Sequence, residues 1–242
     1  MTAIAAIKRP DGIFLMADGA GYGPDGTLLK IAPKVVLMPH VPAALAGRGS
    51  SMILSGLLSL QVESILSFDQ LIEYMPHGLK VATKMAGPIA TLGLGGGRAE
   101  VVVCGWSAER ERPEIWVIAN QPMKTRGADN EIVDTPAYEA IEWQTPYLGQ
   151  MPSKDLCQEF GFALPVDPTQ FEPLVHGVAW FHALRRNTVS AETDVEREYF
   201  GATEGLHLVG GFLQIAGIYS NGIDSKIIQR WPDTIGSKIE PK

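Results

Sequence analysis

Residues 2–18, TAIAAIKRPDGIFLMAD, set the expected architecture of this chain. Two apolar runs, Ala3–Ile7 and Ile13–Ala17, flank the turn sequence RPDG at 9–12. Proline and glycine between two such runs predict a β-hairpin. The first strand of this hairpin starts directly behind Thr2, where most chains have a loosely ordered terminus. The sequence therefore predicts that the first residues have a fixed position.

The remaining elements are expected in blocks. Two short strands, at 34–39 and 41–47, precede a helical block over 50–86. Ser67 is the expected N-cap of the second helix in this block, and Pro76 is expected to kink or divide it. Strands are expected again at 88–96, 99–107 and 113–120, and helices over 153–186. The chain ends with two strands around the Asn221-Gly222 turn, whereas the polar stretch 120–152 gives no clear prediction.

This order of elements predicts an α+β fold. Strands, two helices, strands, two helices and strands favour two antiparallel sheets face to face, each covered on its outer face by helices. A doubly wound parallel sheet is the alternative, but it alternates single strands with single helices, and the hairpins disfavour it. No repeat, low-complexity segment or linker divides the chain, so residues 1–242 are expected to form a single domain.

The composition excludes several classes of protein. Of 242 residues, 45% are hydrophobic and 19% charged, which is typical of a globular chain with a sizeable core. The formal net charge of −7 argues against nucleic acid as a partner. No apolar run has the length of a membrane span, and no signal peptide is recognised. Two cysteines, Cys104 and Cys157, are expected to be reduced, so we expect a cytoplasmic protein without a membrane partner.

Thr2 is the first candidate for chemistry. If Met1 is removed, Thr2 carries a hydroxyl and a free α-amine on one residue. An α-amine has a reference pKa of about 7.7–8.0, so it can accept a proton near neutral pH. A hydroxyl with its own base attached is one recognised form of activated nucleophile. The pattern indicates a candidate nucleophile at Thr2.

Three further residues complete the candidate site. Asp18 ends the strand that pairs with the Thr2 strand, and Lys34 begins the next strand. A lysine beside the Thr2 hydroxyl would lower the pKa of that hydroxyl, and Asp18 would hold the lysine charged and in place. Gly47 precedes the first long helix, and its N–H is the candidate donor to an oxyanion. The histidines are not spaced as metal ligands, and neither a metal nor an organic cofactor is expected.

Thr2, Asp18 and Lys34, each sixteen residues after the one before, resemble the proteasome β-type subunits of the N-terminal nucleophile (Ntn) hydrolases. The AG motif that ends at Gly47 and the strands VVVCGWS and PEIWVIA add to this resemblance. It implies a four-layer αββα sandwich, a nucleophilic threonine and a homo-oligomeric ring. In the family, an Arg-Asp pair followed by serine supports the nucleophile; here RRNTVS offers Asn187 and Ser190.

The resulting hypothesis is a proteasome-like threonine hydrolase that cleaves peptide bonds through an acyl-enzyme. Two alternatives stay open. One is a catalytically inactive assembly subunit on the same fold. The other is an Ntn amidohydrolase that acts on a small-molecule amide. Reactivity of Thr2 distinguishes the first alternative, and turnover of small amides without peptide cleavage distinguishes the second.

Overall fold

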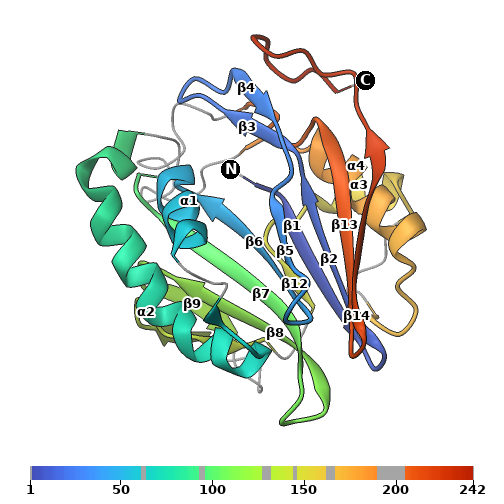
Figure 1. The fold of residues 1–242 in the computed structure, drawn as a ribbon. Coiled ribbons are helices and arrows are strands. Elements are labelled where there is room, and N and C mark those ends of the chain that lie inside the picture. The colour runs from blue at the N-terminus through green and yellow to red at the C-terminus, as the bar shows by residue number, and fades with distance from the viewer. Residues whose placement is uncertain are drawn as a thin grey trace.

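Two five-stranded antiparallel sheets form the centre of the protein (Figure 1). The structure is a computed structural model, and it describes residues 2–60, 64–92, 96–126, 132–143, 146–161, 167–189 and 205–241. The first sheet has the order β12-β1-β2-β13-β14. Its strands are β1 (Ile4–Arg9), β2 (Gly12–Asp18), β12 (Tyr147–Leu148), β13 (Phe212–Tyr219) and β14 (Gly222–Arg230).

The second sheet has the order β11-β8-β7-β6-β5. Its strands are β5 (Val35–Met38), β6 (Ala43–Gly49), β7 (Ala99–Ser107), β8 (Arg112–Ala119) and β11 (Ile141–Glu142). Two separate hairpins pair β3 (Ala20–Tyr22) with β4 (Leu28–Ile31), and β9 (Met123–Arg126) with β10 (Ile132–Thr135). The α-helices of the described residues are α1 (Ser51–Ser59), α2 (Phe68–Ala86), α3 (Lys154–Glu159) and α4 (Val178–Arg186).

Both faces of β1 are buried. Ile4 and Ala6 belong to an apolar cluster shared with the second sheet. Ala3, Ala5 and Ile7 belong to a cluster shared with α4. A strand that is buried on both faces reads as a continuous apolar run, which is the pattern of the N-terminal sequence. Burial on two faces also fixes the register of β1, since a slip by one residue would exchange the two faces.

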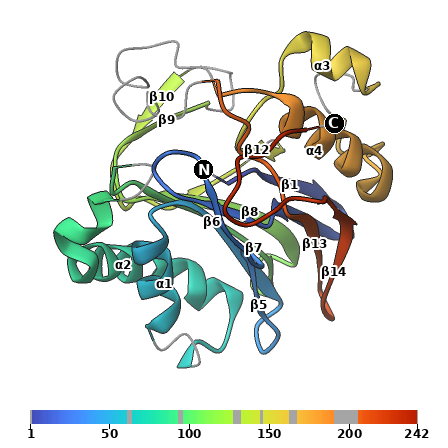
Figure 2. The same ribbon diagram turned by 90° about the horizontal axis from the view of Figure 1, so that it is seen from above.

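Helices cover the outer faces of the two sheets. A third apolar cluster joins α1 and α2 to the second sheet, through residues such as Leu57, Leu71 and Val103. Seen from above, α1 and α2 lie on one side of the sheets, and α3 and α4 lie on the other (Figure 2). The protein is thus a mixed α and β chain with antiparallel sheets, compatible with a sandwich.

Several predicted elements are confirmed. β1 and β2 form the N-terminal hairpin, with Arg9 opposite Gly12. β13 and β14 form the expected C-terminal hairpin, but its turn lies at Ser220-Asn221 rather than Asn221-Gly222, because Gly222 already pairs with Tyr219 as the first residue of β14. The hydroxyl of Ser67 accepts a hydrogen bond from the N–H of Gln70 at 3.1 Å, so Ser67 caps α2 as expected. No helix in the described part of the chain combines the length and the apolar character that crossing a bilayer requires.

Other predictions are wrong. The strand expected at 88–96 is a 3₁₀ helix over Gly87–Leu92, with residues 93–95 outside the described residues. Pro88 lacks the N–H that a sheet ladder needs, and the hydroxyl of Thr91 donates to its carbonyl at 2.7 Å, which closes a turn instead. Pro76 does not divide α2, because the helix continues through it from Phe68 to Ala86. The alternative, a kink at Pro76, stays a prediction.

The second half of the chain also differs from the expectation. The described residues of the stretch 120–152 contain four short strands, β9 to β12, which the sequence did not indicate. The two helices expected over 153–186 are present as α3 and α4, but the helical structure is shorter than expected, since α3 ends at Glu159 and helical structure resumes in a π-helical turn at Pro173–Gly177. Residues 162–166, between these two elements, lie outside the described residues.

Candidate active site

Asp18 and Lys34 form a buried ion pair. Asp18 is the last residue of β2, and its side chain is fully buried. Lys34 precedes β5 in the other sheet, and its Nζ lies 2.7 Å from Oδ1 of Asp18. The side chain of Lys34 retains 16% of its exposure. The pair therefore joins the two sheets at the end of β2, with the lysine on the side nearer to solvent.

The Asp18 carboxylate also holds three backbone groups. Oδ1 accepts the N–H of Ala3 at 3.1 Å, in addition to the Lys34 ammonium. Oδ2 accepts the N–H of Ala20 at 3.1 Å and that of Gly210 at 3.3 Å. Hydrogen bonds to both oxygens fix the orientation of the carboxylate. The residue after Thr2 is thereby fixed to the same oxygen as Lys34.

Thr2 lies beside this carboxylate, immediately before Ala3, and is 7% exposed. Met1, whose removal the predicted chemistry requires, lies outside the described residues. The antiparallel register of β1 and β2 places Ile4 opposite Ala17, so Ala3 stands opposite Asp18. Three of the predicted site residues, Thr2, Asp18 and Lys34, are thus brought to one place.

Gly47 lies next to Lys34. The register of β5 and β6 pairs Val35 with Ala46, so the next position of this ladder sets Lys34 beside Gly47. A side chain at Gly47 would overlap the Cδ2 atom of Leu54 in α1, which explains the glycine. All four predicted site residues therefore gather where β1, β2, β5 and β6 meet, and both views show the N-terminal end of β1 near β6 (Figures 1 and 2).

Burial lowers the pKa of Lys34 from its ordinary value. Desolvation is the largest cause, the charge of Lys30 acts in the same direction, and the charge and hydrogen bond of Asp18 oppose them. The net direction means that burial outweighs the ion pair. A lysine in this state holds its proton less firmly than a surface lysine does.

A second buried ion pair, which the sequence did not indicate, lies near Asp18. The Arg185 guanidinium in α4 contacts both oxygens of Asp233, at 2.8 and 2.6 Å. Oδ2 of Asp233 accepts the N–H of Gly211 at 2.7 Å, next to the Gly210 N–H that bonds Asp18. Two adjacent glycines therefore connect the two carboxylates. The two consecutive glycines before β13 were the sequence feature that could have indicated this contact, because glycine in an apolar run marks a close approach of another backbone or side chain.

Tyr22 contributes a buried hydroxyl to the same region. This hydroxyl has no hydrogen-bond partner among the described residues. Burial, together with the charges of Asp18 and Asp233, raises the pKa of Tyr22 well above its usual range. The phenol is thus neutral at physiological pH and adds no charge to the site.

Asn187 lies at the end of α4. Its Oδ1 accepts the N–H of Ser153 at 3.2 Å, and its Nδ2 donates to the carbonyl of Thr188 at 3.2 Å. The bond from Ser153, the N-cap residue of α3, connects the end of α4 to the start of α3. Ser190, the other residue of the RRNTVS motif considered for the site, lies outside the described residues.

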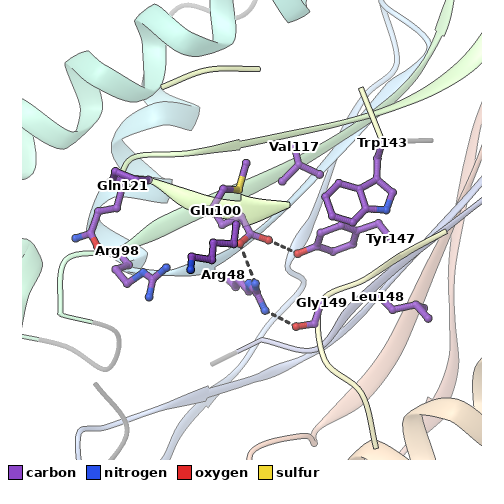
Figure 3. Close-up of a pocket in the computed structure, with 12 residues that line it drawn as sticks. Arg48, Arg98, Glu100, Val117, Gln121, Trp143, Tyr147, Leu148 and Gly149 are labelled. Atoms are coloured by element: carbon purple, nitrogen blue, oxygen red, sulfur yellow. Dashed lines mark hydrogen bonds and ion pairs between the residues drawn. The ribbon is translucent and has the colours of Figure 1, made fainter. Parts of the chain in front are cut away.

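A pocket of about 460 Å³ opens next to the site (Figure 3). Arg48, the residue after Gly47, donates to the carbonyl of Gly149 and pairs with Glu100 at 2.8 Å. The hydroxyl of Tyr147 donates to the other oxygen of Glu100. The pocket is lined by Arg48, Arg98, Glu100, Val117, Gln121, Pro122, Met123, Lys124, Trp143, Tyr147, Leu148 and Gly149. Sequence reasoning did not find it, since Arg48 and Gly149 are 101 residues apart.

The described residues offer no metal centre. Among them, no group of three or more histidine, cysteine, aspartate or glutamate side chains lies close enough to hold an ion. Cys104 and Cys157 are both free and buried, and burial raises the pKa of each thiol.

Comparison with known proteins identifies the fold but neither a family nor an activity. No family model matches the sequence, and no curated protein matches it. Among solved structures, the chain is similar to an Anbu (Gly-1) mutant from Hyphomicrobium sp. strain MC1, with a TM-score of 0.57 and 13% identity over 95% of this chain and 88% of that one. It is also similar to Anbu (ancestral beta-subunit) from Yersinia bercovieri, with a TM-score of 0.60 and 9% identity over 95% of this chain and 87% of that one. The fold is therefore proteasome-like.

Proposed function

We propose that the protein is a proteasome-like hydrolase that uses Thr2 as an N-terminal nucleophile to cleave peptide bonds. One observation carries the proposal: Oδ1 of Asp18 accepts both the Lys34 ammonium at 2.7 Å and the N–H of Ala3 at 3.1 Å. The carboxylate thus connects the lysine to the residue that follows Thr2. The proteasome-like fold supports the same proposal.

In the proposed mechanism, the α-amine of Thr2 takes the proton of its own hydroxyl, and Oγ1 attacks the substrate carbonyl carbon. The Lys34 ammonium lowers the pKa of the hydroxyl, and Asp18 orients that ammonium. The N–H of Gly47 donates to the oxyanion. The C–N bond then breaks, and the leaving amine receives the proton held by the α-amine. Water hydrolyses the resulting ester and restores Thr2.

The layer arrangement of the fold, the extent of the domain and the oligomeric state are part of this proposal. The two sheets with helices outside them would be the αββα sandwich of the Ntn hydrolases, in a single domain over residues 1–242. A homo-oligomeric ring would follow from the same family. Size-exclusion chromatography with light scattering tests the ring, because a monomer of 242 residues and a ring differ several-fold in mass.

A second candidate, an inactive assembly subunit, is favoured by one observation. Asn187 stands where the family resemblance expects an aspartate, and its side chain bonds Ser153 and Thr188. Such a subunit would keep the ring without the chemistry. A free amine at Thr2 distinguishes the two candidates, since the proposed base exists only when Met1 has been removed.

The deciding experiment combines mass and activity. The intact mass of the purified protein reports whether Met1 is present. Hydrolysis of fluorogenic peptides and of small aryl amides is then compared for the wild type, Thr2→Ala and Thr169→Ala, an exposed threonine far from β1 in sequence. The proposal expects loss of peptide hydrolysis in Thr2→Ala alone. Retention of Met1, or equal activity of the wild type and Thr2→Ala, would contradict it, and turnover of the aryl amides alone would indicate a small-molecule amidohydrolase.

A further inference from the structure

The described lining of the pocket beside Gly47 carries more positive than negative charge. Among the lining residues that the structure describes, three are cationic, Arg48, Arg98 and Lys124, and one is anionic, Glu100. Both oxygens of Glu100 are already engaged, one by Arg48 and one by Tyr147. The chain as a whole carries a net charge of −7. A positively charged pocket in an acidic protein indicates a site for an anionic group.

The lining divides into a polar end and an apolar end. Arg98 and Gln121 lie at one end of the pocket, and Val117 and Trp143 lie at the other (Figure 3). The ring of Trp143 packs edge-on against Tyr147, with centroids 5.6 Å apart. Pockets that join an apolar wall to a few polar groups orient their ligand. The occupant that fits is an apolar group with an anion next to it.

The pocket adjoins the site on the side opposite Asp18. The N–H of Gly149 donates to the carbonyl of Ile4 at 2.9 Å, so the pocket wall runs alongside the start of β1. Ile4 is two residues from Thr2, a distance of about 7 Å in an extended chain. On the other sheet, Arg48 directly follows Gly47. An extended peptide held at Thr2 would therefore reach the pocket within a few residues.

We propose that this pocket binds a carboxylate carried by the peptide substrate and so selects acidic peptides. The inference rests on the proposed function, because it assumes that a peptide occupies the Thr2 site. A carboxylate fits guanidinium and ammonium donors better than a neutral amide does, since charged pairs make stronger hydrogen bonds. The carboxylate can come from a glutamate side chain or from the C-terminus of the peptide.

Binding is measured in the Thr2→Ala variant, so that hydrolysis does not interfere and catalysis is not required. Three kinds of hexapeptide of alanine and leucine, labelled with an uncharged dye, are compared by fluorescence anisotropy. One kind carries a single glutamate at successive positions and an amidated C-terminus. Another has a free C-terminus without glutamate, and the third is neutral throughout. We expect one of the two carboxylate-bearing kinds to bind at least tenfold more tightly than the neutral peptides. This difference in affinity should become smaller at high salt, because salt screens the attraction between charges.

Two charge variants and one control test the assignment to this pocket. Lys124→Glu and Arg98→Gln, each combined with Thr2→Ala, are expected to reduce the preference to threefold or less. The matched control is Lys226→Glu, which changes an exposed lysine on β14 in the same way and is expected to leave the preference intact.

Two results would overturn the inference. One is equal binding of neutral and carboxylate-bearing peptides. The other is a preference that persists in both Lys124→Glu and Arg98→Gln. Neither result depends on turnover, so an inactive wild type would count against the proposed function alone.

Discussion

The N–H of Ala3 donates to Oδ1 of Asp18 at 3.1 Å, so the backbone just behind the chain terminus is tied to a carboxylate 15 residues away. The carbonyl of Ala3 in turn accepts the N–H of Asp18 at 3.3 Å. Asp18 is fully buried and carries the Lys34 ammonium on the same oxygen. The position of Thr2 and the charge of Lys34 therefore depend on one side chain.

Replacing Asp18 by asparagine should destabilise the fold strongly. The Asp18→Asn variant keeps the shape of the side chain but leaves the buried Lys34 ammonium without its counter-charge. Breaking a buried pair from one side costs about 3–5 kcal/mol in the free energy of unfolding. Urea unfolding followed by far-ultraviolet circular dichroism measures this loss.

Asp11→Asn is the matched control for Asp18→Asn. Asp11 pairs with Arg9 at 3.6 Å, and its side chain is 67% exposed, so this change should cost less than about 1 kcal/mol. The double variant Asp18→Asn/Lys34→Met should be more stable than Asp18→Asn, because it removes the unpaired charge. Equal losses for Asp11→Asn and Asp18→Asn would show that the buried pair has no special role.

Arg185 and Arg186 are adjacent, yet they should differ greatly in their contribution to stability. Arg185 and Asp233 form a buried pair with side-chain exposures of 6% and 5%, whereas Arg186 and Glu159 lie at the surface with 43% and 50%. Arg185→Met should cost about 3–5 kcal/mol in the free energy of unfolding and Arg186→Met less than about 1 kcal/mol. Urea unfolding of the two variants side by side checks this, and similar losses would contradict it.

The sequence predicted the local parts of this structure better than the distant ones. The hairpin of residues 2–18 followed from two apolar runs and a turn, and the structure confirms it. Thr2, Asp18 and Lys34 were named from chemistry and from a family resemblance, and the structure brings them together. Each of these inferences needed only neighbouring residues or a known spacing.

The missed parts depend on contacts between distant residues. Arg185 meets Asp233 across 48 positions, and Arg48 meets Gly149 across 101. No periodic pattern in the sequence indicates such a pair, because each member taken alone is typical of a surface or loop position. The short strand β12 is likewise defined by its pairing with β1 rather than by its own two residues.

Alanine at Gly47 should require the Leu54 side chain to move or to be made smaller. The added methyl group of Gly47→Ala would overlap Cδ2 of Leu54, and such overpacking typically costs about 1–3 kcal/mol. The Gly47→Ala/Leu54→Ala double variant should lose less stability than the sum of its single variants, since the overlap is gone. A thermodynamic cycle from urea unfolding of the four proteins measures this coupling. Additive losses would mean that Leu54 does not restrict residue 47.

The pH dependence of stability should show whether burial or the pairing with Asp18 has the larger effect on the pKa of Lys34. Burial lowers the pKa of Lys34 in the folded protein, while in the unfolded chain it stays near its ordinary value of 10.5. Between these two pKa values the unfolded chain binds more protons than the folded one, so the free energy of unfolding rises with pH. The wild type should therefore gain stability relative to Lys34→Met as the pH rises from 7 towards 10.

Urea unfolding of both proteins at several pH values tests this sign. Lys154→Met, at an exposed position that starts α3, controls for the loss of any lysine and should run parallel to the wild type. A gain of the wild type over Lys34→Met with rising pH would mean that desolvation outweighs the pairing with Asp18. A loss of stability of the wild type relative to Lys34→Met with rising pH would mean that Asp18 raises the pKa of Lys34. A lysine whose pKa is raised in the folded protein contributes stability that disappears as the pH rises through that pKa. In that case Lys34 would remain charged throughout the neutral range, and its ammonium would be available beside Thr2 at every pH in that range.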